Sequence, residues 1–210
     1  LIESGRIDQA IESLGIAIAL NPSQATIFLS RGNALLKLER YKESIEDYDM
    51  AIALQDGFAE AHLNRGEALK NLNRLEEAVE AYDQALKVDP ESSVACYNKA
   101  NTLSLLNNHE TALQCYDAAI ALRPAYMEAF YNRGAALQKL GRSEEALTSY
   151  DRVTALDPYR AEAFNNKGVL FQNLGRMHDA LENYDQAIEL KPDFFEVLNN
   201  RGNPLRDLEQ

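Results

Sequence analysis

Side-chain amides recur at one spacing along this chain, once in each of five successive thirty-four-residue segments. We call this set the asparagine register: Asn64, Asn98, Asn132, Asn166 and Asn200, with Ser30 one segment earlier. Each amide offers two N–H donors and an acceptor oxygen. A row of amides can therefore hydrogen-bond an extended peptide backbone whatever its side chains are. The same amides can instead tie neighbouring helices together, and the spacing leaves both interpretations open.

The residues beside these amides would give such a site its specificity. Leu63, Tyr97 and Tyr131 directly precede asparagines of the register. Tyrosine combines a large contact area with a polar tip, which makes it a common anchor at interfaces. Glu128 and Glu162 fall on the same face, near its rim. The residues predicted to bind a peptide are therefore Asn64, Asn98, Asn132, Asn166, Asn200, Tyr97, Tyr131, Leu63, Glu128 and Glu162.

No other set of residues points to chemistry. The three histidines are far apart in the repeat, and no serine, histidine and acid occur together in a catalytic pattern. The carboxylates follow the repeat, which is typical of solvated faces rather than of a general acid and base. Cys96 and Cys115 form no CxxC pair, so neither a zinc site nor a disulfide framework is indicated. The sequence predicts no catalytic residue, no cofactor and no metal site, and therefore a protein that is not an enzyme.

The thirty-four-residue period extends to other residue types and organises the whole chain. Glycine recurs at one position, proline at a second and tyrosine at a third. The glycine register is Gly32, Gly66, Gly134, Gly168 and Gly202, with Ala100 in the remaining place. The tyrosine register is Tyr48, Tyr82, Tyr116, Tyr150 and Tyr184. A fixed period of this length predicts a repeat array rather than a single-core domain.

Each repeat has the pattern of two helices. In residues 59–92, apolar residues recur three and four apart, which is the period of an amphipathic helix, first over 59–73 and again over 76–88. Asp89 and Pro90 then end the second helix, because the residue before proline avoids the helical region. A glycine inside a helix costs about 1 kcal/mol relative to alanine. Its recurrence predicts that the helices approach too closely for a side chain, beside the tyrosines.

Alanine and proline recur at the same spacing as the glycine and tyrosine registers: Ala78, Ala112, Ala146 and Ala180, and Pro22, Pro90, Pro124, Pro158 and Pro192. Together these four registers resemble the tetratricopeptide repeat over nearly the whole chain. The resemblance implies an all-α fold: a right-handed superhelical solenoid of antiparallel helix pairs, with about twelve helices. It also implies that the first helix of each pair lines a concave face that holds a peptide or a helix. The asparagine register is similar to the asparagine ladder in the repeat region of O-linked N-acetylglucosamine transferases.

The period sets the expected boundaries of the repeats. We expect a single array over residues 1–210, with complete repeats at 25–58, 59–92, 93–126, 127–160 and 161–194. Residues 1–24 are expected to hold a second helix, from Ile7 to Leu20, and the end of a first helix near Leu1. Residues 195–210 are expected to hold a first helix that kinks or ends near Pro204, since an interior proline costs about 3 kcal/mol.

One pair of registers departs from the general pattern of the family. A cation precedes each glycine of the register, or Ala100, and an aspartate follows each tyrosine. The cations are Arg31, Arg65, Lys99, Arg133, Lys167 and Arg201, and the aspartates are Asp49, Asp83, Asp117, Asp151 and Asp185. Opposite charges that repeat in step predict a ladder of ion pairs between stacked helices.

Charge and hydropathy narrow the possible partners. The formal net charge is -12, whereas a nucleic-acid binder needs a basic surface to displace counterions. Anionic lipid is disfavoured for the same reason, and no apolar run approaches the length of a membrane span. Two lone cysteines fit a reducing compartment. We therefore expect a protein or peptide partner, no nucleic acid, no membrane and a cytoplasmic location.

These observations favour a protein-interaction scaffold that binds a peptide or protein segment in its concave groove. A first alternative is the substrate-recruiting region of a larger enzyme, such as a glycosyltransferase whose catalytic domain lies elsewhere. A second is a self-assembling scaffold, because neither end of the array has the polar cap with which solenoids normally finish. The latter predicts end-to-end association between copies.

Overall fold

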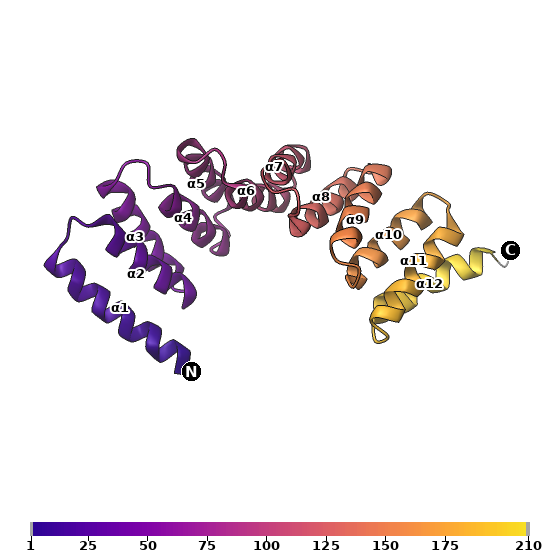
Figure 1. Ribbon diagram of the computed structural model, residues 1–210, viewed down its shortest axis with the longest axis horizontal. Helices are drawn as coiled ribbons and strands as arrows, with labels where there is room; N and C mark the ends of the chain where they lie inside the picture. The colour runs from indigo at the N-terminus through magenta and orange to yellow at the C-terminus, as the bar shows by residue number, and fades with distance from the viewer. Residues whose placement is uncertain (1, 209–210) are drawn as a thin grey trace. The chain divides into compact units, whose positions relative to one another are not determined.

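The computed structural model describes residues 2–208, and every regular element in that range is an α-helix (Figure 1). The helices are α1 (Ile2–Leu20), α2 (Ala25–Lys37), α3 (Tyr41–Leu54), α4 (Ala59–Asn71), α5 (Leu75–Val88), α6 (Ser93–Leu105), α7 (His109–Leu122), α8 (Met127–Lys139), α9 (Ser143–Leu156), α10 (Ala161–Asn173), α11 (Met177–Leu190) and α12 (Phe195–Leu208). The predicted all-α architecture of helix pairs is confirmed.

The chain folds as two compact units. Unit 1 is Leu1–Asn107 and contains α1 to α6, and unit 2 is Asn108–Gln210 and contains α7 to α12. The boundary lies in the turn between α6 and α7. It divides the repeat predicted at residues 93–126, so the single array over residues 1–210 stays a prediction.

A short left-handed turn joins the two helices of each repeat. One turn residue has positive φ: Glu39, Asn73, Asn107, Gly141 or Gly175. The next residue closes the turn, as where the Arg74 N–H donates to the Leu69 carbonyl over 2.9 Å. This hydrogen bond is typical of a Schellman motif, in which a helix ends at a residue with positive φ. Because the turn is so short, the two helices that it joins within a unit pack side by side, as α4 packs on α5 and α10 on α11.

An arginine at the start of the second helix adds a further contact. Arg74 donates to both carboxylate oxygens of Glu77, over 2.7 and 2.6 Å. Equivalent pairs join Arg40 to Glu43 and Arg142 to Glu145. The arginines lower the pKa of these glutamates. Both partners are solvent-exposed, so each pair contributes little to stability.

The glycine register packs against the tyrosine register of the same repeat. A Cβ atom built on Gly168 would lie 2.5 Å from the Tyr184 ring, and one built on Gly66 would lie 2.6 Å from the Tyr82 ring. The same close approach occurs between Gly32 and Tyr48 and between Gly134 and Tyr150. These four tyrosines have no solvent exposure. The predicted close approach is confirmed, and the tyrosine ring is the group that requires it.

The predicted ladder of ion pairs is also confirmed. Five of the six cations pair with the aspartate of the preceding repeat: Arg65–Asp49, Lys99–Asp83 and Arg133–Asp117 at 2.6 Å, Lys167–Asp151 at 2.7 Å and Arg201–Asp185 at 2.5 Å. The cation side chains are 15–37% exposed and the aspartates 44–60%. Water screens the acidic side, so the pairs set the register of stacked helices more than they add stability.

The first cation of the series has a different partner. The preceding repeat would supply its aspartate at position 15, where the chain has Gly15. Arg31 therefore pairs with Asp47 of its own repeat, through bonds of 2.8 and 2.6 Å. Asp47 is 3% exposed.

Two predictions at the ends of the array are wrong. A second helix was expected from Ile7, after the end of a first helix, but α1 is one helix from Ile2 to Leu20. The chain was also expected to kink or end near Pro204. The part of this prediction that is wrong is the end of the helix, because α12 runs to Leu208 with Pro204 inside it and buried.

Candidate functional site

In unit 1 the asparagine register joins neighbouring first helices. The Asn64 side chain on α4 donates to the side-chain oxygen of Asn33 on α2, over 2.8 Å. The Tyr48 hydroxyl on α3 donates to the same oxygen, over 2.9 Å. Asn98 is half-buried at the equivalent position of α6. One bond uses one of the two N–H donors of Asn64, so a second donor and an acceptor oxygen remain for a ligand.

Unit 2 repeats this arrangement with different partners. Asn166 on α10 donates to the Tyr131 hydroxyl on α8 over 3.1 Å, and Asn200 on α12 donates to the Asn165 oxygen over 3.2 Å. Asn132 on α8 is half-buried at the same register position. The amides thus tie neighbouring first helices, which is one of the two interpretations left open by the sequence, and each described tie occupies a single donor.

A charged cluster surrounds Tyr131. The Arg160 guanidinium lies 5.4 Å from the centre of the Tyr131 ring and 3.3 Å from a Glu162 oxygen. The second Glu162 oxygen lies 4.0 Å from the Lys191 ammonium, which in turn lies 4.8 Å from the centre of the Phe194 ring. Arginine and lysine over aromatic faces are attracted by the ring quadrupole. This cluster places a hydroxyl, a carboxylate and two cations beside Asn166.

The other predicted residues take different positions. Leu63 is half-buried and packs against the core of unit 1, and Tyr97 is half-buried. Glu128 is exposed at the start of α8. Leu63 therefore contributes to the core of unit 1 as well as to the proposed binding face, whereas the Glu128 side chain is accessible to solvent.

Sequence reasoning missed three residues of this face: Asn33, Arg160 and Lys191. A further residue, Asn165, lies at the repeat position of Tyr97 and Tyr131 and directly precedes Asn166 of the register. Asn165 is 4% exposed, and its amide also lies 3.5 Å from a Glu196 oxygen. Asn33 belongs to no register, because glutamate, asparagine and alanine follow at its position in the next repeats. Arg160 and Lys191 lie between repeats, where the periodic pattern carries no signal.

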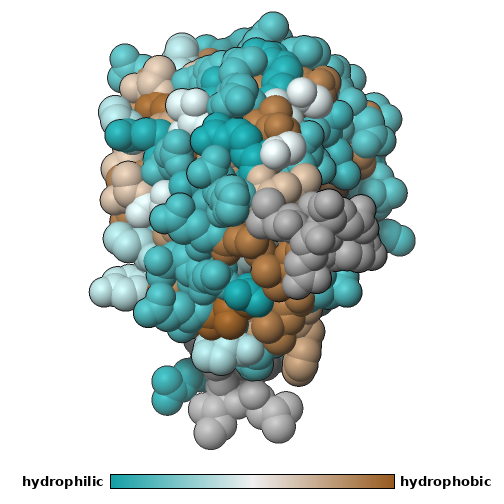
Figure 2. Space-filling model, turned by 90° about the vertical axis from the view of Figure 1, so that its right-hand side faces the viewer, coloured by the Kyte–Doolittle hydropathy of each residue, from teal (hydrophilic) through white to brown (hydrophobic). Residues whose placement is uncertain are grey.

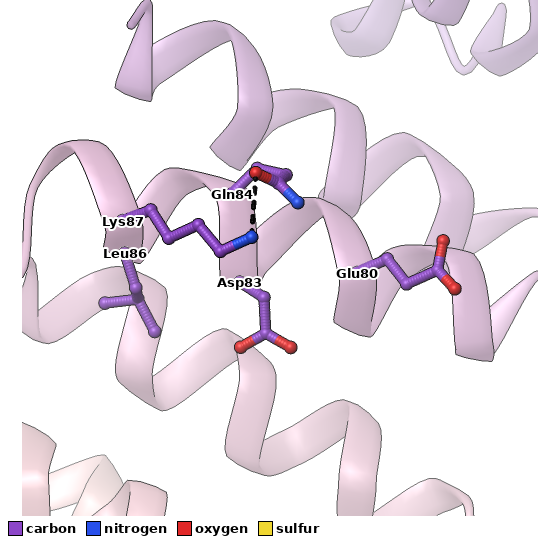
Figure 3. Close-up of a pocket in the computed structure, with 5 residues that line it drawn as sticks. All are labelled: Glu80, Asp83, Gln84, Leu86 and Lys87. Atoms are coloured by element: carbon purple, nitrogen blue, oxygen red, sulfur yellow. Dashed lines mark hydrogen bonds between the residues drawn. The ribbon is translucent and has the colours of Figure 1, made fainter.

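A separate cavity of about 430 Å³ lies along α5. Its lining residues are Glu80, Asp83, Gln84, Leu86 and Lys87, and Lys87 donates to Gln84 over 3.3 Å (Figure 3). The side chains in Figure 3 all come from one helix and do not converge on a common point. The cavity is therefore an open depression on a helix surface.

The titratable groups give no sign of an acid–base site. Burial raises the pKa of the Tyr184 hydroxyl to about 12, and burial also raises the pKa of the Cys96 thiol. Burial followed by the charge of Arg65 lowers the pKa of His62. In the part of the chain that the structure describes, no three His, Cys, Asp or Glu residues could hold a metal ion. None of the described helices is both long and apolar enough to span a membrane.

Family models match most of the chain. Tetratricopeptide repeat models match residues 59–92, 128–159 and 161–194, and further models of the repeat match residues 1–57, 81–114 and 100–141. The chain belongs to the tetratricopeptide repeat family. No curated protein sequence matches it significantly.

Solved tetratricopeptide repeat (TPR) structures share this fold. YrrB, described as "a TPR protein with an unusual peptide-binding site", is 28% identical with a TM-score of 0.81, over 91% of this chain and 99% of YrrB. MamA is 19% identical with a TM-score of 0.76, over 82% of this chain and 94% of MamA. MamA from Desulfovibrio magneticus RS-1 is 22% identical with a TM-score of 0.76, over 81% and 96%. The MamA likenesses concern the fold alone.

Proposed function

We propose that this tetratricopeptide repeat chain is a non-catalytic interaction scaffold whose first helices bind an extended peptide. The observation that carries the proposal is the spare hydrogen-bonding capacity of the asparagine register. Asn64, Asn166 and Asn200 each use one N–H donor on a neighbouring helix. At Asn64 and Asn200 this leaves a second donor and a carbonyl oxygen, which is the complement that a peptide backbone needs, whereas Asn166 also hydrogen-bonds the Tyr150 hydroxyl and offers its carbonyl oxygen.

The face of unit 2 supplies the side-chain contacts for such a peptide. Tyr131 contributes an aromatic surface, held in place by Asn166 on one side and Arg160 on the other. Fixed aromatic groups bind with little loss of conformational freedom, which suits them as anchors. The similarity to YrrB, a TPR protein with a peptide-binding site, supports the proposal.

The test is peptide selection followed by a matched pair of substitutions. A display library of random peptides is selected on the immobilised 210-residue chain, and the best binder is labelled for fluorescence anisotropy. Asn166→Ala removes an amide from the first-helix face, whereas Gln186→Ala removes one from α11 in the same unit. We expect Asn166→Ala to weaken the peptide by about tenfold, the effect of one hydrogen bond of about 1.4 kcal/mol.

Thermal unfolding of both variants separates binding from folding. Retained melting behaviour in Asn166→Ala, with weakened binding, supports a contact to the peptide. Equal affinities for the parent and Asn166→Ala, or equal losses in both variants, would rule out the proposed face.

A further inference from the structure

A cavity of about 290 Å³ lies between α10 and α11 in unit 2, and we call it the α10–α11 groove. Its lining includes Phe164, Lys167 and Phe171 from α10 and Asp179, Glu182 and Gln186 from α11. The three α10 residues follow one another at intervals of three and four, so they share one face of the helix. Asn166 lies roughly 130° around the helix from that face, at 3.6 residues per turn. The groove and the asparagine register are therefore on different faces of α10.

The charges of the groove leave one carboxylate unpaired. The Lys167 ammonium lies 2.7 Å from an oxygen of Asp151 on α9, and the Asp179 carboxylate lies 2.7 Å from the Arg176 guanidinium. Glu182 is exposed and has no ion-pair or hydrogen-bond partner among the described residues. The paired charges cancel, so the groove keeps one negative charge, in a chain whose formal net charge is -12.

The preceding repeat of unit 2 shows which side chain this kind of groove holds. Between α8 and α9, the Arg152 guanidinium lies 5.7 Å from the centre of the Phe130 ring. Phe130 is equivalent to Phe164, thirty-four residues later, and Arg152 is equivalent to Gln186. A guanidinium at this distance is attracted by the quadrupole of the ring. In the α10–α11 groove the ring is present and half-buried, but the chain supplies no arginine at that position.

Two further substitutions separate these grooves in the same direction. Glu182 and Phe171 stand where α9 and α8 have Thr148 and Leu137. Together with the missing arginine, they remove one positive charge, add one negative charge and add a second aromatic ring. The Arg176 guanidinium, at the edge of the groove, lies 4.5 Å from the centre of the Phe171 ring. An arginine of the chain itself therefore already contacts one part of this surface.

The helix pairs of unit 1 lack one half of this combination. On α5, Glu80 and Gln84 repeat the carboxylate and the amide, but His62 and Leu69 of α4 stand at the positions of the two phenylalanines. On α2 the phenylalanine is present as Phe28, but it is only 5% exposed. The α10–α11 groove thus combines a half-buried aromatic ring with an unpaired carboxylate.

We propose that the α10–α11 groove binds an arginine side chain from a basic segment of a protein partner. The guanidinium lies over the Phe164 ring and pairs with the Glu182 carboxylate. Arginine suits the groove better than lysine, because its planar guanidinium both stacks on a ring and forks onto a carboxylate. This contact is separate from the peptide-binding face proposed above.

The surface around the groove agrees with a charged partner. Figure 2 looks onto unit 2 from the side of its last helices, where hydrophilic residues (teal) predominate and apolar residues (brown) gather between them. Charge therefore contributes more than apolar area to the choice of a partner here. The net charge of -12 also attracts a basic segment from a distance and speeds the encounter.

Fluorescence anisotropy of a labelled basic peptide, titrated with the 210-residue chain, tests the proposal. The probe is three Arg-Gly-Ser triplets in a row, and its control carries citrulline, which is uncharged, in place of each arginine. Gln186→Arg gives the groove an arginine of its own, as in α9, and should weaken the probe by about tenfold. Gln84→Arg is the matched control: it adds the same side chain at the same repeat position of α5, and should bind like the parent.

Two further substitutions examine the two halves of the site. Glu182→Gln removes the carboxylate, and Glu80→Gln removes the equivalent one from α5, so only Glu182→Gln should weaken the probe. Phe164→Leu keeps an apolar side chain but removes the ring, and should weaken the probe by about threefold. Thermal unfolding shows that each variant is folded at the temperature of the titration.

Three results would overturn the proposal. The first is equal affinity of the parent and Gln186→Arg for the probe, or no binding by the parent. The second is an equal loss in Gln84→Arg, which indicates general attraction to an acidic chain. The third is undiminished binding of the citrulline peptide, which means that the guanidinium is not recognised.

Discussion

Gly168 and Gly202 occupy the same position in their repeats, yet only one of them is required by its surroundings. Gly168 lies beneath the Tyr184 ring, 2.5 Å from where a Cβ would be, and Gly202 has open space around it. Gly141 is a third kind: it has room for a Cβ, but its φ of +73° is one that other residues rarely adopt. A repeated residue therefore acquires its structural role from the neighbour that it meets, and not from its place in the pattern.

The largest effect is expected from removing the neighbour itself. Tyr184→Ala deletes a fully buried aromatic ring, and we expect a loss of roughly 3–5 kcal/mol in the free energy of unfolding. Tyr159→Ala, at a residue 80% exposed in the same unit, should change it by less than about 0.5 kcal/mol. Urea unfolding followed by circular dichroism gives both values. Similar losses in the two variants would refute the packing role of the register tyrosine.

Adding a methyl group at the two glycines should act in opposite directions. Gly168→Ala overpacks the space under Tyr184, at a cost of about 1–3 kcal/mol. Alanine has a higher helix propensity than glycine, which offsets about 1 kcal/mol of this cost. Because Ala100 fills the register in another repeat, we expect a net loss in the lower part of that range. Gly202→Ala meets no neighbour and should gain up to about 1 kcal/mol. Stabilisation by Gly168→Ala would contradict the close approach.

The left-handed turn predicts a smaller penalty at Gly141. Gly141→Ala places a Cβ in a conformation that costs roughly 1 kcal/mol for residues with side chains. Glu39→Gly is the reverse substitution, since Glu39 adopts φ of 59° at the same turn position, and should stabilise unit 1 by less than that. Thermal unfolding of both variants gives the signs. If Gly141→Ala is neutral, the turn can relax and does not depend on glycine.

The smallest effect concerns the ion-pair ladder. Arg133 pairs with Asp117 of the preceding repeat and donates to Ser149 over 2.7 Å in its own repeat. We expect Arg133→Ala to cost up to roughly 1 kcal/mol and Lys42→Ala, at an exposed residue of α3, to cost less. Melting curves at low and high salt distinguish them, since salt screens the ion pair. A salt-independent loss would mean that the arginine acts through packing alone.

The repeat made most of the fold predictable from the sequence. Residues that recur in every repeat, such as Tyr82 and Asp83, have the same contacts wherever their neighbours are the same, so their roles followed from spacing. The failures lie where a neighbour changes. Arg31 turned to Asp47 because Gly15 replaces the expected aspartate, and α12 continues past Pro204, which is buried.

The candidate site was predictable only in its periodic part. The asparagine register was recognisable, and Asn165 lies at the repeat position of Tyr97 and Tyr131. The partner Asn33 was not recognisable, because tertiary packing rather than spacing selects it. Arg160 and Lys191 lie between helices, outside the amphipathic pattern from which the helices were inferred. Residues at such non-periodic positions have to be found from the structure.

The ion-pair ladder has a consequence for the length of the chain. From Arg65 onward, each cation meets an aspartate supplied by the repeat before it, and the complete repeats present the same two groups at the same positions. Removing residues 59–92 would leave Lys99 opposite Asp49, with the pairing rule intact. Duplicating that segment would add one matched pair and break none. Whole repeats are thus interchangeable modules, and the array can be lengthened or shortened by thirty-four residues at a time without orphaning a charge.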